Sequence, residues 1–589
     1  MAIEIEEQGI VPVIEAELEA YDREVGRFRR EENDPLEFQA YRLREGVYGQ
    51  RQPDGQMMRV KIPGGITTAK QLEALADVAE RYAPLGKGHI TTRENVQFHH
   101  MSLEEAGEAK WRIAKVGLTS REACGNTVRN VITCPMAGVC KGEPFDITPY
   151  LAAFVRYFVR KPFTQGMPRK WKTSFSPCPS DCALAPMHDL GFVAQVREEN
   201  GVQRKGFRIH VGGGTSIMAR LAPALYDFIP VEEYLRVCEA ILRVYNKRDE
   251  LRKNRMMARV KVLIDRIGID AFRELVEQEL KEEWAKDPID PTPYIMTNYE
   301  RTPGPYKGGN GHQERAESDP DFLHWRATNT VAQRQEGYYA AHVKVPAGDL
   351  SAHQFRALAE LSREYSNGQA RMSFEQNLIF RWIPENKLYD LWRELVALEL
   401  GEGGVDEITD VTSCPGTDSC KLGITSSMGA GRAVRQHLLD LSIQDPLVRD
   451  MHVKLSGCPN GCGRHHLASI GFQGASVKGE GGQQVPAYEV YVGGRYDDGV
   501  VQYAKRVVSK IPSKRVPQAV ERILGLYQSQ RQDNEPFYAF VDRVGLKPIE
   551  EALADLRGAG PVADNLDLYQ DWERVGLYKV ERGEGECAV

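Results

Sequence analysis

Hydrophobic and polar positions follow a strand–helix–strand pattern in the segment MMRVKIPGGITTAKQLEALADVAERYAPLGKGHITTRENVQFHHM, residues 57–101. The first strand ends at a turn formed by Gly64 and Gly65. Leu72, Leu75 and Val78 then recur at helical spacing, and a second strand is expected near residues 89–99. The pattern predicts a small α+β unit.

The same pattern returns in the second half of the chain, as AHVKVPAGDLSAHQFRALAELSREYSNGQARMSFEQNLIFRW. Val60-Lys61-Ile62-Pro63 matches Val343-Lys344-Val345-Pro346, and further on Leu190-Gly191-Phe192 matches Ile470-Gly471-Phe472. A long internal repeat indicates two copies of one unit, which can pair about a pseudo-two-fold axis. Each copy is expected to contain a small strand–helix–strand domain followed by a larger α/β domain.

This duplication divides the chain into expected parts. They are an amino-terminal helical arm (1–50), the first small domain (51–120), the first larger α/β domain (121–284), a linker rich in proline, glycine and charge (285–335), the second small domain (336–400), the second larger α/β domain (401–530) and a peripheral tail (531–589).

Composition restricts the class of protein. Of 589 residues, 42% are apolar and 27% charged, as in soluble globular proteins, and the net charge of −7 does not favour nucleic acid as a partner. No apolar run approaches the roughly 20 residues that cross a bilayer, so no membrane partner is expected. The acidic start of the chain does not resemble a signal peptide, which predicts a cytoplasmic protein.

The candidate chemistry lies in VTSCPGTDSC and VKLSGCPNGC of the second half. Their two cysteine pairs, Cys414 with Cys420 and Cys458 with Cys462, can surround a compact cluster of soft iron. Disulfides, a zinc site and ordinary buried thiols are the alternatives. The cluster is favoured, because nothing marks the chain as secreted and zinc sites usually have shorter cysteine spacings.

From about Tyr41 to Tyr527, with these cysteine motifs, the chain resembles the sirohaem-dependent sulfite and nitrite reductases. The resemblance implies an α+β fold in which two ferredoxin-like half-domains pair beside two larger domains. It also implies a 4Fe–4S cluster held by Cys414, Cys420, Cys458 and Cys462, with Cys462 shared with the iron of sirohaem.

The resemblance implies four catalytic cations that receive a small oxyanion, namely Arg59, Arg129, Lys170 and Lys172. Guanidinium groups clamp oxyanions through charge-assisted hydrogen bonds, and ammonium groups can help to deliver protons. Residues expected to contact the macrocycle or its carboxylates are Thr92, Arg93, Gln97, Asn130 and Asn460, with Arg255, Arg259 and Lys261 as weaker candidates. His99 and His100 are interpreted as hydrogen-bonding residues and not as axial ligands.

Two features depart from the best-known members. The first half retains its own cysteines, Cys134, Cys140, Cys178 and Cys182, with both spacings intact. A second cluster, a remnant with free thiols and a site for another metal are the three interpretations, and the second cluster is favoured. In addition, Cys124 stands where some relatives have a cysteine joined covalently to a tyrosine, for which Tyr48 is the candidate. Cys238 and Cys587 have no partners by spacing.

The expected reaction is the six-electron reduction of sulfite to sulfide, because Lys170-Trp171-Lys172 resembles the sulfite-reducing members. Nitrite reduction to ammonia at the same site is the alternative, and a non-catalytic iron–sulfur electron carrier is the rival from another class. No flavin or nicotinamide fingerprint is visible, so electrons are expected from a partner, either ferredoxin or a separate flavoprotein.

Overall fold

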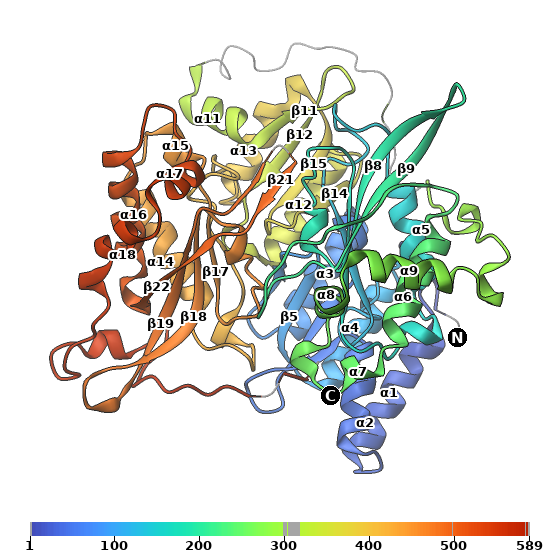
Figure 1. Ribbon diagram of the computed structural model, residues 1–589, viewed down its shortest axis with the longest axis horizontal. Helices are drawn as coiled ribbons and strands as arrows, with labels where there is room; N and C mark the ends of the chain where they lie inside the picture. Colours follow the sequence, from blue (N-terminus) through green and yellow to red (C-terminus); the bar gives the residue numbers. More distant parts are fainter. Residues whose placement is uncertain (1–2, 298–302, 304–317, 498, 584, 587–589) are drawn as a thin grey trace.

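The computed structural model describes residues 3–297, 303, 318–497, 499–583 and 585–586 (Figure 1). Much of the expected linker, and Cys587, therefore lie outside the described residues. Four five-stranded sheets organise the described chain, two in a pair of small domains and two in a pair of larger domains.

The first small domain has a four-stranded antiparallel sheet of its own, covered by two helices. The Thr68 hydroxyl and the Gln71 side chain form a capping box that fixes the start of the first helix. The strands, in spatial order, are β1 (Val47–Gly49), β2 (Gln56–Val60), β5 (Val96–Met101) and β4 (Lys87–Ile90), and the helices are α3 (Ala69–Tyr82) and α4 (Leu103–Ala114).

The second small domain repeats this arrangement. Ser351 and Gln354 form the equivalent capping box. The strands, in spatial order, are β11 (Thr330–Ala332), β12 (Tyr338–Val343), β15 (Leu378–Pro384) and β14 (Gln369–Met372), and the helices are α12 (Ala352–Tyr365) and α13 (Leu388–Ala397).

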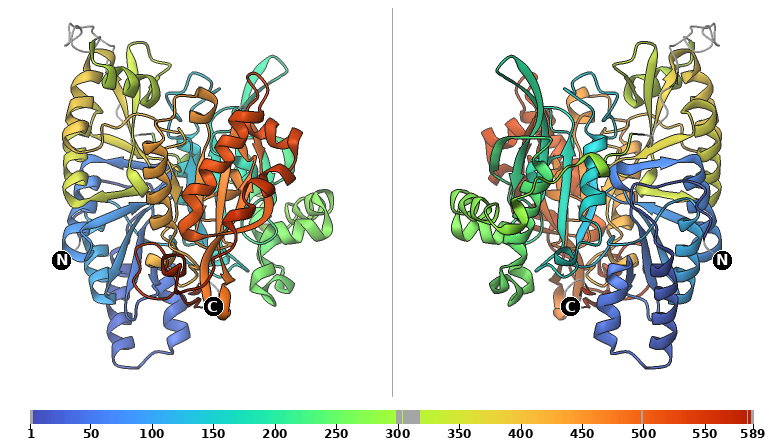
Figure 2. Two further views of the ribbon diagram at one scale, coloured as in Figure 1. Left: turned by 90° about the vertical axis from the view of Figure 1, so that its left-hand side faces the viewer. Right: turned by 90° about the vertical axis from the view of Figure 1, so that its right-hand side faces the viewer.

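The two small domains complete each other's sheets. Strand β3 (Ile66–Thr68) of the first copy pairs with β14, and β13 (Asp349–Ser351) of the second pairs with β4. Helices α3 and α12 pack against one another across a shared apolar core. In side view the two copies, blue and yellow, form one layer (Figure 2). The predicted duplication into paired half-domains is confirmed.

The two larger domains have the same sheet order, in which three parallel strands are followed by two antiparallel ones. The first sheet contains β6 (Val128–Thr133), β7 (Trp171–Ser176), β8 (Leu190–Glu199), β9 (Val202–Val211) and β10 (Ala224–Pro230). The second contains β16 (Thr412–Ser413), β17 (Val453–Ser456), β18 (Ile470–Lys478), β19 (Gln484–Val492) and β22 (Lys505–Pro512). Parallel strands end at the same sheet edge, and the cysteine motifs follow the first two strands of each sheet.

Helices cover both larger sheets, and several of them lie on the outer side, away from the half-domain layer (Figure 2). In the first they are α5 (Thr148–Phe158), α6 (Tyr234–Asn246), α7 (Asp249–Arg252), α8 (Val260–Ile267) and α9 (Ile269–Glu279). In the second they are α14 (Ser427–Asp440), α15 (Pro446–Arg449), α16 (Val516–Gln530), α17 (Phe537–Val544) and α18 (Lys547–Ala552). The remaining elements are α1 (Glu15–Arg29), α2 (Pro35–Arg44), α11 (Pro320–Asn329), β20 (Arg495–Asp497) and β21 (Val500–Gln502).

The terminal segments are more integrated than an arm and a tail. Tyr21 and Val25 of α1 belong to the half-domain core, and β1 is an edge strand of its sheet. Phe540 and Ile549 of α17 and α18 lie in the core of the second larger domain. Their apolar faces are buried, which removes apolar surface from water.

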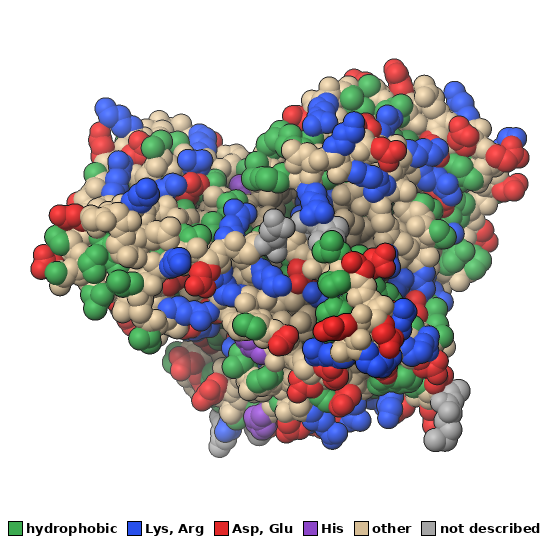
Figure 3. Space-filling model, turned by 90° about the horizontal axis from the view of Figure 1, so that it is seen from below, with side chains coloured by type: hydrophobic (Ala, Val, Ile, Leu, Met, Phe, Trp, Pro, Cys, Tyr) green, Lys and Arg blue, Asp and Glu red, His purple; other side chains and the backbone are tan. Residues whose placement is uncertain are grey.

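The surface mixes charges, and basic and acidic side chains alternate over the face seen from below (Figure 3). Within the described residues no helix has both the length and the apolarity needed to span a bilayer.

Candidate functional site

The carboxyl-terminal cysteines gather at the carboxyl edge of the second larger sheet. Cys414 directly follows β16 and Cys458 follows β17, and these parallel strands pair with Ser413 beside Leu455. Burial, together with the nearby thiols of Cys462 and Cys420, raises the pKa of Cys414 to about 12. The four thiols therefore lie close enough to influence each other's charge.

Local hydrogen bonds and glycines hold this arrangement. The Gly457 amide donates to Cys414 Sγ over 3.3 Å, and the Ser427 hydroxyl lies 3.3 Å from the same sulfur. A Cβ on Gly457 would lie 2.7 Å from the Cα of Gly416, so a side chain there would push the two loops apart. Amide donors to sulfur and close backbone approach suit a thiolate-bound cluster.

Among the described residues, no group of three or more His, Cys, Asp or Glu side chains is placed to hold one metal ion. Tetrahedral zinc with four thiolates needs sulfurs only about 3.8 Å apart, given its Zn–S bond length. A larger iron–sulfur cluster separates its cysteine sulfurs more widely than zinc does.

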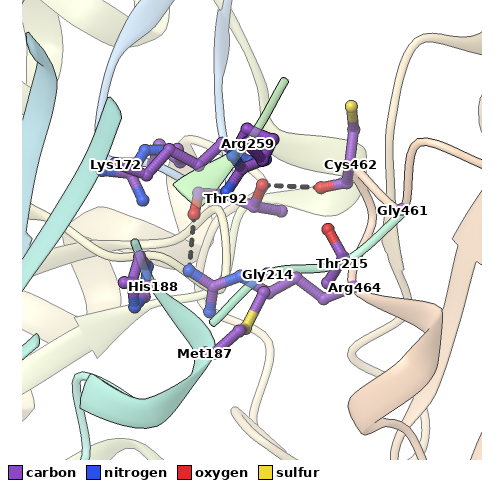
Figure 4. A pocket seen from close by; sticks show the side chains of 11 residues that line it. Thr92, Lys172, Met187, His188, Gly214, Thr215, Arg259, Gly461, Cys462 and Arg464 are labelled. Atoms are coloured by element: carbon purple, nitrogen blue, oxygen red, sulfur yellow. Dashed lines mark hydrogen bonds between the residues drawn. The ribbon is translucent and has the colours of Figure 1, made fainter. Parts of the chain in front are cut away.

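A cavity opens beside the exposed thiol of Cys462 (Figure 4). It holds about 320 Å³ of space, including the part open to solvent. The Thr92 hydroxyl donates to the Cys462 carbonyl over 2.7 Å, and Arg464 Nη2 donates to the Thr92 carbonyl over 2.7 Å. The cavity is lined by Thr92, Arg93, Lys172, Met187, His188, Gly214, Thr215, Arg259, Gly461, Cys462 and Arg464.

Buried positive charge dominates this cavity. Burial, together with the nearby charge of Arg464, lowers the pKa of Arg93 to about 9. Burial also lowers the pKa of Lys172 well below its usual value, and the charges of Lys170, Arg93 and Arg259 add to the effect. Crowded cations repel one another in a poorly solvated site, so an anionic ligand would relieve the cost.

Some donors of these buried cations make no hydrogen bond to the described residues. Arg259 forms an ion pair with Asp189 over 2.7 and 2.8 Å. In contrast, Arg93 Nε and Arg464 Nη1 are buried without a hydrogen-bond partner among the described residues. Buried polar groups normally have partners. The side chains therefore fit a group that carries several carboxylates.

The structure places the four expected catalytic cations at different distances from this cavity, and one of them, Lys172, lines it. Arg59 Nη1 and Arg129 Nη1 both donate to the Ala123 carbonyl, over 3.1 and 2.9 Å. Arg59 lies opposite Gln97 on the neighbouring strand, and its Nε lies 2.8 Å from the Gln97 amide oxygen once that amide is turned. Arg129 contributes to the lowered pKa of Arg93, as Lys170 does to that of Lys172. Of the four, only Lys172 lines the cavity; Arg129 and Lys170 act on the charges of lining residues, and Arg59 shares the Ala123 carbonyl with Arg129.

Other expected site residues hold backbone in place. Asn130 donates its amide to the carbonyls of Ile62 and Arg93, over 2.8 and 3.0 Å. The Asn460 side chain accepts from the hydroxyl of Ser216 over 3.3 Å. Lys261 donates to three carbonyls of one loop, those of Thr215, Ile217 and Met218.

The remaining candidates lie away from Cys462. Arg255 is exposed. His99 and His100 line a second cavity with His89, and burial with its histidine neighbours lowers the pKa of His99 to about 3. Cys124 belongs to a small apolar cluster against which Tyr48 packs. The crosslink between Cys124 and Tyr48 stays a prediction.

Sequence reasoning missed Arg464, Met187, His188 and Thr215 as cavity residues. Arg464 was detectable in principle, because it stands two positions after Cys462. Met187 and His188 follow the Cys182 motif, so their proximity to Cys462 depends on contact between the two halves of the chain.

Comparison with known proteins agrees with the fold and the site described above. The family model described as nitrite and sulphite reductase 4Fe-4S domain matches residues 124–284 and 404–558. The model for the nitrite/sulfite reductase ferredoxin-like half domain matches 48–116 and 331–398. These matches define a duplicated oxidoreductase with two 4Fe-4S-type domains and two ferredoxin-like half-domains. The chain belongs to the nitrite and sulfite reductase family.

Individual relatives carry both substrate names. The chain is 28% identical over 491 residues to sulfite reductase [ferredoxin] 1 of Mycolicibacterium paratuberculosis, covering 83% of this chain and 82% of the relative. It is 28% identical over 542 residues to the assimilatory ferredoxin-dependent nitrite reductase of Haloferax mediterranei, covering 90% and 89%. The solved Mycobacterium tuberculosis NirA protein has a TM-score of 0.75 at 25% identity, covering 90% of this chain and 95% of that one.

Proposed function

We propose that this protein reduces sulfite to sulfide, using sirohaem coupled to a 4Fe–4S cluster and electrons from an external donor such as ferredoxin. The observation that supports this most directly is the buried cationic cavity beside the exposed Cys462 thiol. An electron carrier has no need of such an anion site. Membership of the family supports the cofactors and the donor.

The residues present fit these cofactors. Cys414, Cys420, Cys458 and Cys462 would hold the cluster, and the Cys462 thiol also faces the cavity. Arg93, Arg259 and Arg464 would pair with the carboxylates of the tetrapyrrole, for which guanidinium groups are well suited. When bound, the tetrapyrrole and cluster supply a metal site for the anion and a store of electrons.

The cationic group would then bind the substrate and manage its protons. Arg59 and Arg129 orient the oxyanion by charge-assisted hydrogen bonds. Sulfite, six electrons and seven protons yield hydrosulfide and three water molecules, so protons must reach each departing oxygen. Lys172 suits this role because its lowered pKa makes its ammonium a readier acid than ordinary lysine.

Nitrite is the second candidate substrate, since relatives of both names match equally well. Steady-state rates with each anion and one reduced donor separate the two. We expect a higher kcat/KM for sulfite, and a higher value for nitrite would reverse the assignment. Turnover of neither anion by protein loaded with both cofactors would favour the electron carrier.

A matched pair of variants tests the cationic group. Lys172→Met should lower kcat/KM for sulfite by at least about tenfold, on the scale of one positioned proton donor. Lys253→Met removes an exposed charge outside the cavity and should leave the rate unchanged. Equal rates for the two variants would show that Lys172 has no role in the reaction.

A further inference from the structure

The cysteines of the first half occupy the same positions in their domain as the carboxyl-terminal ones do in theirs. Cys134 directly follows β6 and Cys178 follows β7, and these strands are parallel, with Thr133 beside Phe175. The turns that carry Cys140 and Cys182 come next along the chain. Every described cysteine is free of disulfide bonds.

The four thiols converge. A Cβ on Gly142, two residues after Cys140, would lie 4.0 Å from the Cβ of Cys178, so the turns that carry the two pairs meet. Cys134 and Cys140 also belong to one apolar cluster with Tyr338 and Trp382 of the second half-domain. Four soft ligands gathered in a largely apolar setting match the donor set of an iron–sulfur cluster.

A loop from the opposite half closes over each quartet. The Gly499 amide donates to the Ser180 carbonyl over 3.1 Å, beside Cys182. In the other half, the Thr215 hydroxyl donates to the Asn460 carbonyl over 3.3 Å, beside Cys462. The two cysteine sites are therefore built and covered in the same way.

The walls around the two quartets differ in chemistry. Leu184 stands where the repeat places Arg464, and both residues precede a short 3-10 helix, with φ of 57° and 61°. Leu184 packs in one apolar cluster with Leu467, and Tyr496 packs against it. The space that corresponds to the cationic cavity is thus filled by apolar and aromatic side chains.

The residues around the first quartet also carry less positive charge than those around the second. The repeat places Glu375 at the position of Arg93 and His452 at that of Lys172. Glu375 is buried in an ion pair with Lys454, and the rings of His452 and Tyr496 lie 5.0 Å apart. A buried carboxylate and aromatic packing oppose the binding of a tetrapyrrole that carries several carboxylates.

We propose that Cys134, Cys140, Cys178 and Cys182 bind a second iron–sulfur cluster of the 4Fe–4S type, with no tetrapyrrole beside it. Such a cluster takes up one electron from a reduced low-potential donor and releases one electron on oxidation. The site does not depend on which anion the protein reduces.

Cofactor stoichiometry tests the proposal on the unaltered protein. Iron, zinc, acid-labile sulfide and extracted sirohaem would be measured on anaerobically purified holoprotein. We expect about eight labile sulfides for each sirohaem, because each cubane contains four. About four labile sulfides with one sirohaem, or stoichiometric zinc, would overturn the second cluster. Two sirohaems per chain would contradict the claim that no tetrapyrrole binds beside the first quartet.

Variants assign the clusters to their cysteines. Cys178→Ser should remove about half of the labile sulfide and leave the sirohaem spectrum unchanged, whereas Cys458→Ser should disturb that spectrum. Cys238→Ala, which alters a buried thiol of α6 outside both quartets, should change neither quantity. Unchanged sulfide in folded Cys178→Ser would contradict the assignment. If that variant does not fold, integrating the electron paramagnetic resonance signal of the reduced wild-type protein decides between one cluster and two.

Discussion

Arg464 reaches the cavity because its backbone adopts φ of 61°, a conformation that few non-glycine residues adopt. Its guanidinium is almost fully buried and donates to the Thr92 carbonyl, but Nη1 has no hydrogen-bond partner among the described residues and lies 3.7 Å from Glu375 Oε1. Strained backbone and a buried donor without a hydrogen bond persist where they serve a ligand.

Arg464→Met should therefore lower the sirohaem content of the purified protein severalfold, because one carboxylate partner is lost. The cluster should remain, since Arg464 is not one of its ligands. Sirohaem and labile sulfide would be measured on the same preparation. Arg255→Met, which removes an exposed arginine, is the control. Full sirohaem occupancy in Arg464→Met would rule out the carboxylate role.

At the residue scale, sequence reasoning identified the types of side chain better than their directions. The cysteine pairs and the cations were recognisable from their motifs. Asn130 and Lys261 were expected at the cofactor, yet both donate to backbone carbonyls. A motif records that a polar residue is present, whereas the fold decides whether its donors face a cavity or a neighbouring loop.

Gly65 lies at a close approach of the two half-domains. It has φ of 65°, and a Cβ there would lie 2.1 Å from the Met372 carbonyl oxygen, where β3 joins β14. Gly86 has a similar φ of 61°, but a Cβ there would meet nothing within 4 Å. Alanine at either position would strain the backbone, but only alanine at Gly65 would also clash with the neighbouring strand.

Gly86→Ala should cost about 1 kcal/mol of unfolding free energy, which is the cost of a left-handed non-glycine residue. Gly65→Ala should cost several times more, since strand and half-domain must also shift. Denaturant unfolding monitored by far-ultraviolet circular dichroism measures both variants. Equal denaturant midpoints for the two variants would show that β3 and β14 can move apart at little cost in free energy.

At the element scale, the repeat was sufficient to predict the duplication but not the exchange of strands. Helices α3 and α12 were visible from their apolar periodicity. β3 and β13 contain only three residues each, too few for a periodic signal, and each pairs with a strand far away in sequence. Such pairing depends on tertiary contacts, which local pattern cannot contain.

At the scale of the whole molecule, the end of the described chain returns to join distant parts. The Glu586 carboxylate accepts from Arg42 over 2.8 Å, from the Gly49 amide over 2.7 Å and from Lys421 over 2.7 Å. One buried carboxylate therefore connects α2 and β1 with the loop that follows Cys420. Through these contacts the tail connects the first half-domain to the cysteine loop.

This bridge has a predictable pH dependence. Burial opposes ionisation of Glu586, but hydrogen bonds and charge from Arg42 and Lys421 outweigh it and lower its pKa from 4.5 to about 2. A lowered carboxylate pKa stabilises the folded state above the unfolded pKa, and that stabilisation is lost as pH falls through the folded pKa. The difference between the unfolded and folded pKa values of Glu586 corresponds to about 3 kcal/mol of unfolding free energy at neutral pH. This contribution is lost between about pH 5 and pH 2.

Glu586→Gln should consequently free the tail at pH 7 and make the segment after α18 more accessible to proteases and to hydrogen exchange. Wild type and variant should converge as the pH falls through about 2, because the wild-type carboxyl becomes protonated there. Glu581→Gln is the matched control, since Glu581 is 71% exposed and lies 3.8 Å from Arg51. A surface pair of this kind contributes little. If Glu581→Gln loosened the tail as much as Glu586→Gln, the bridge would not be what anchors it.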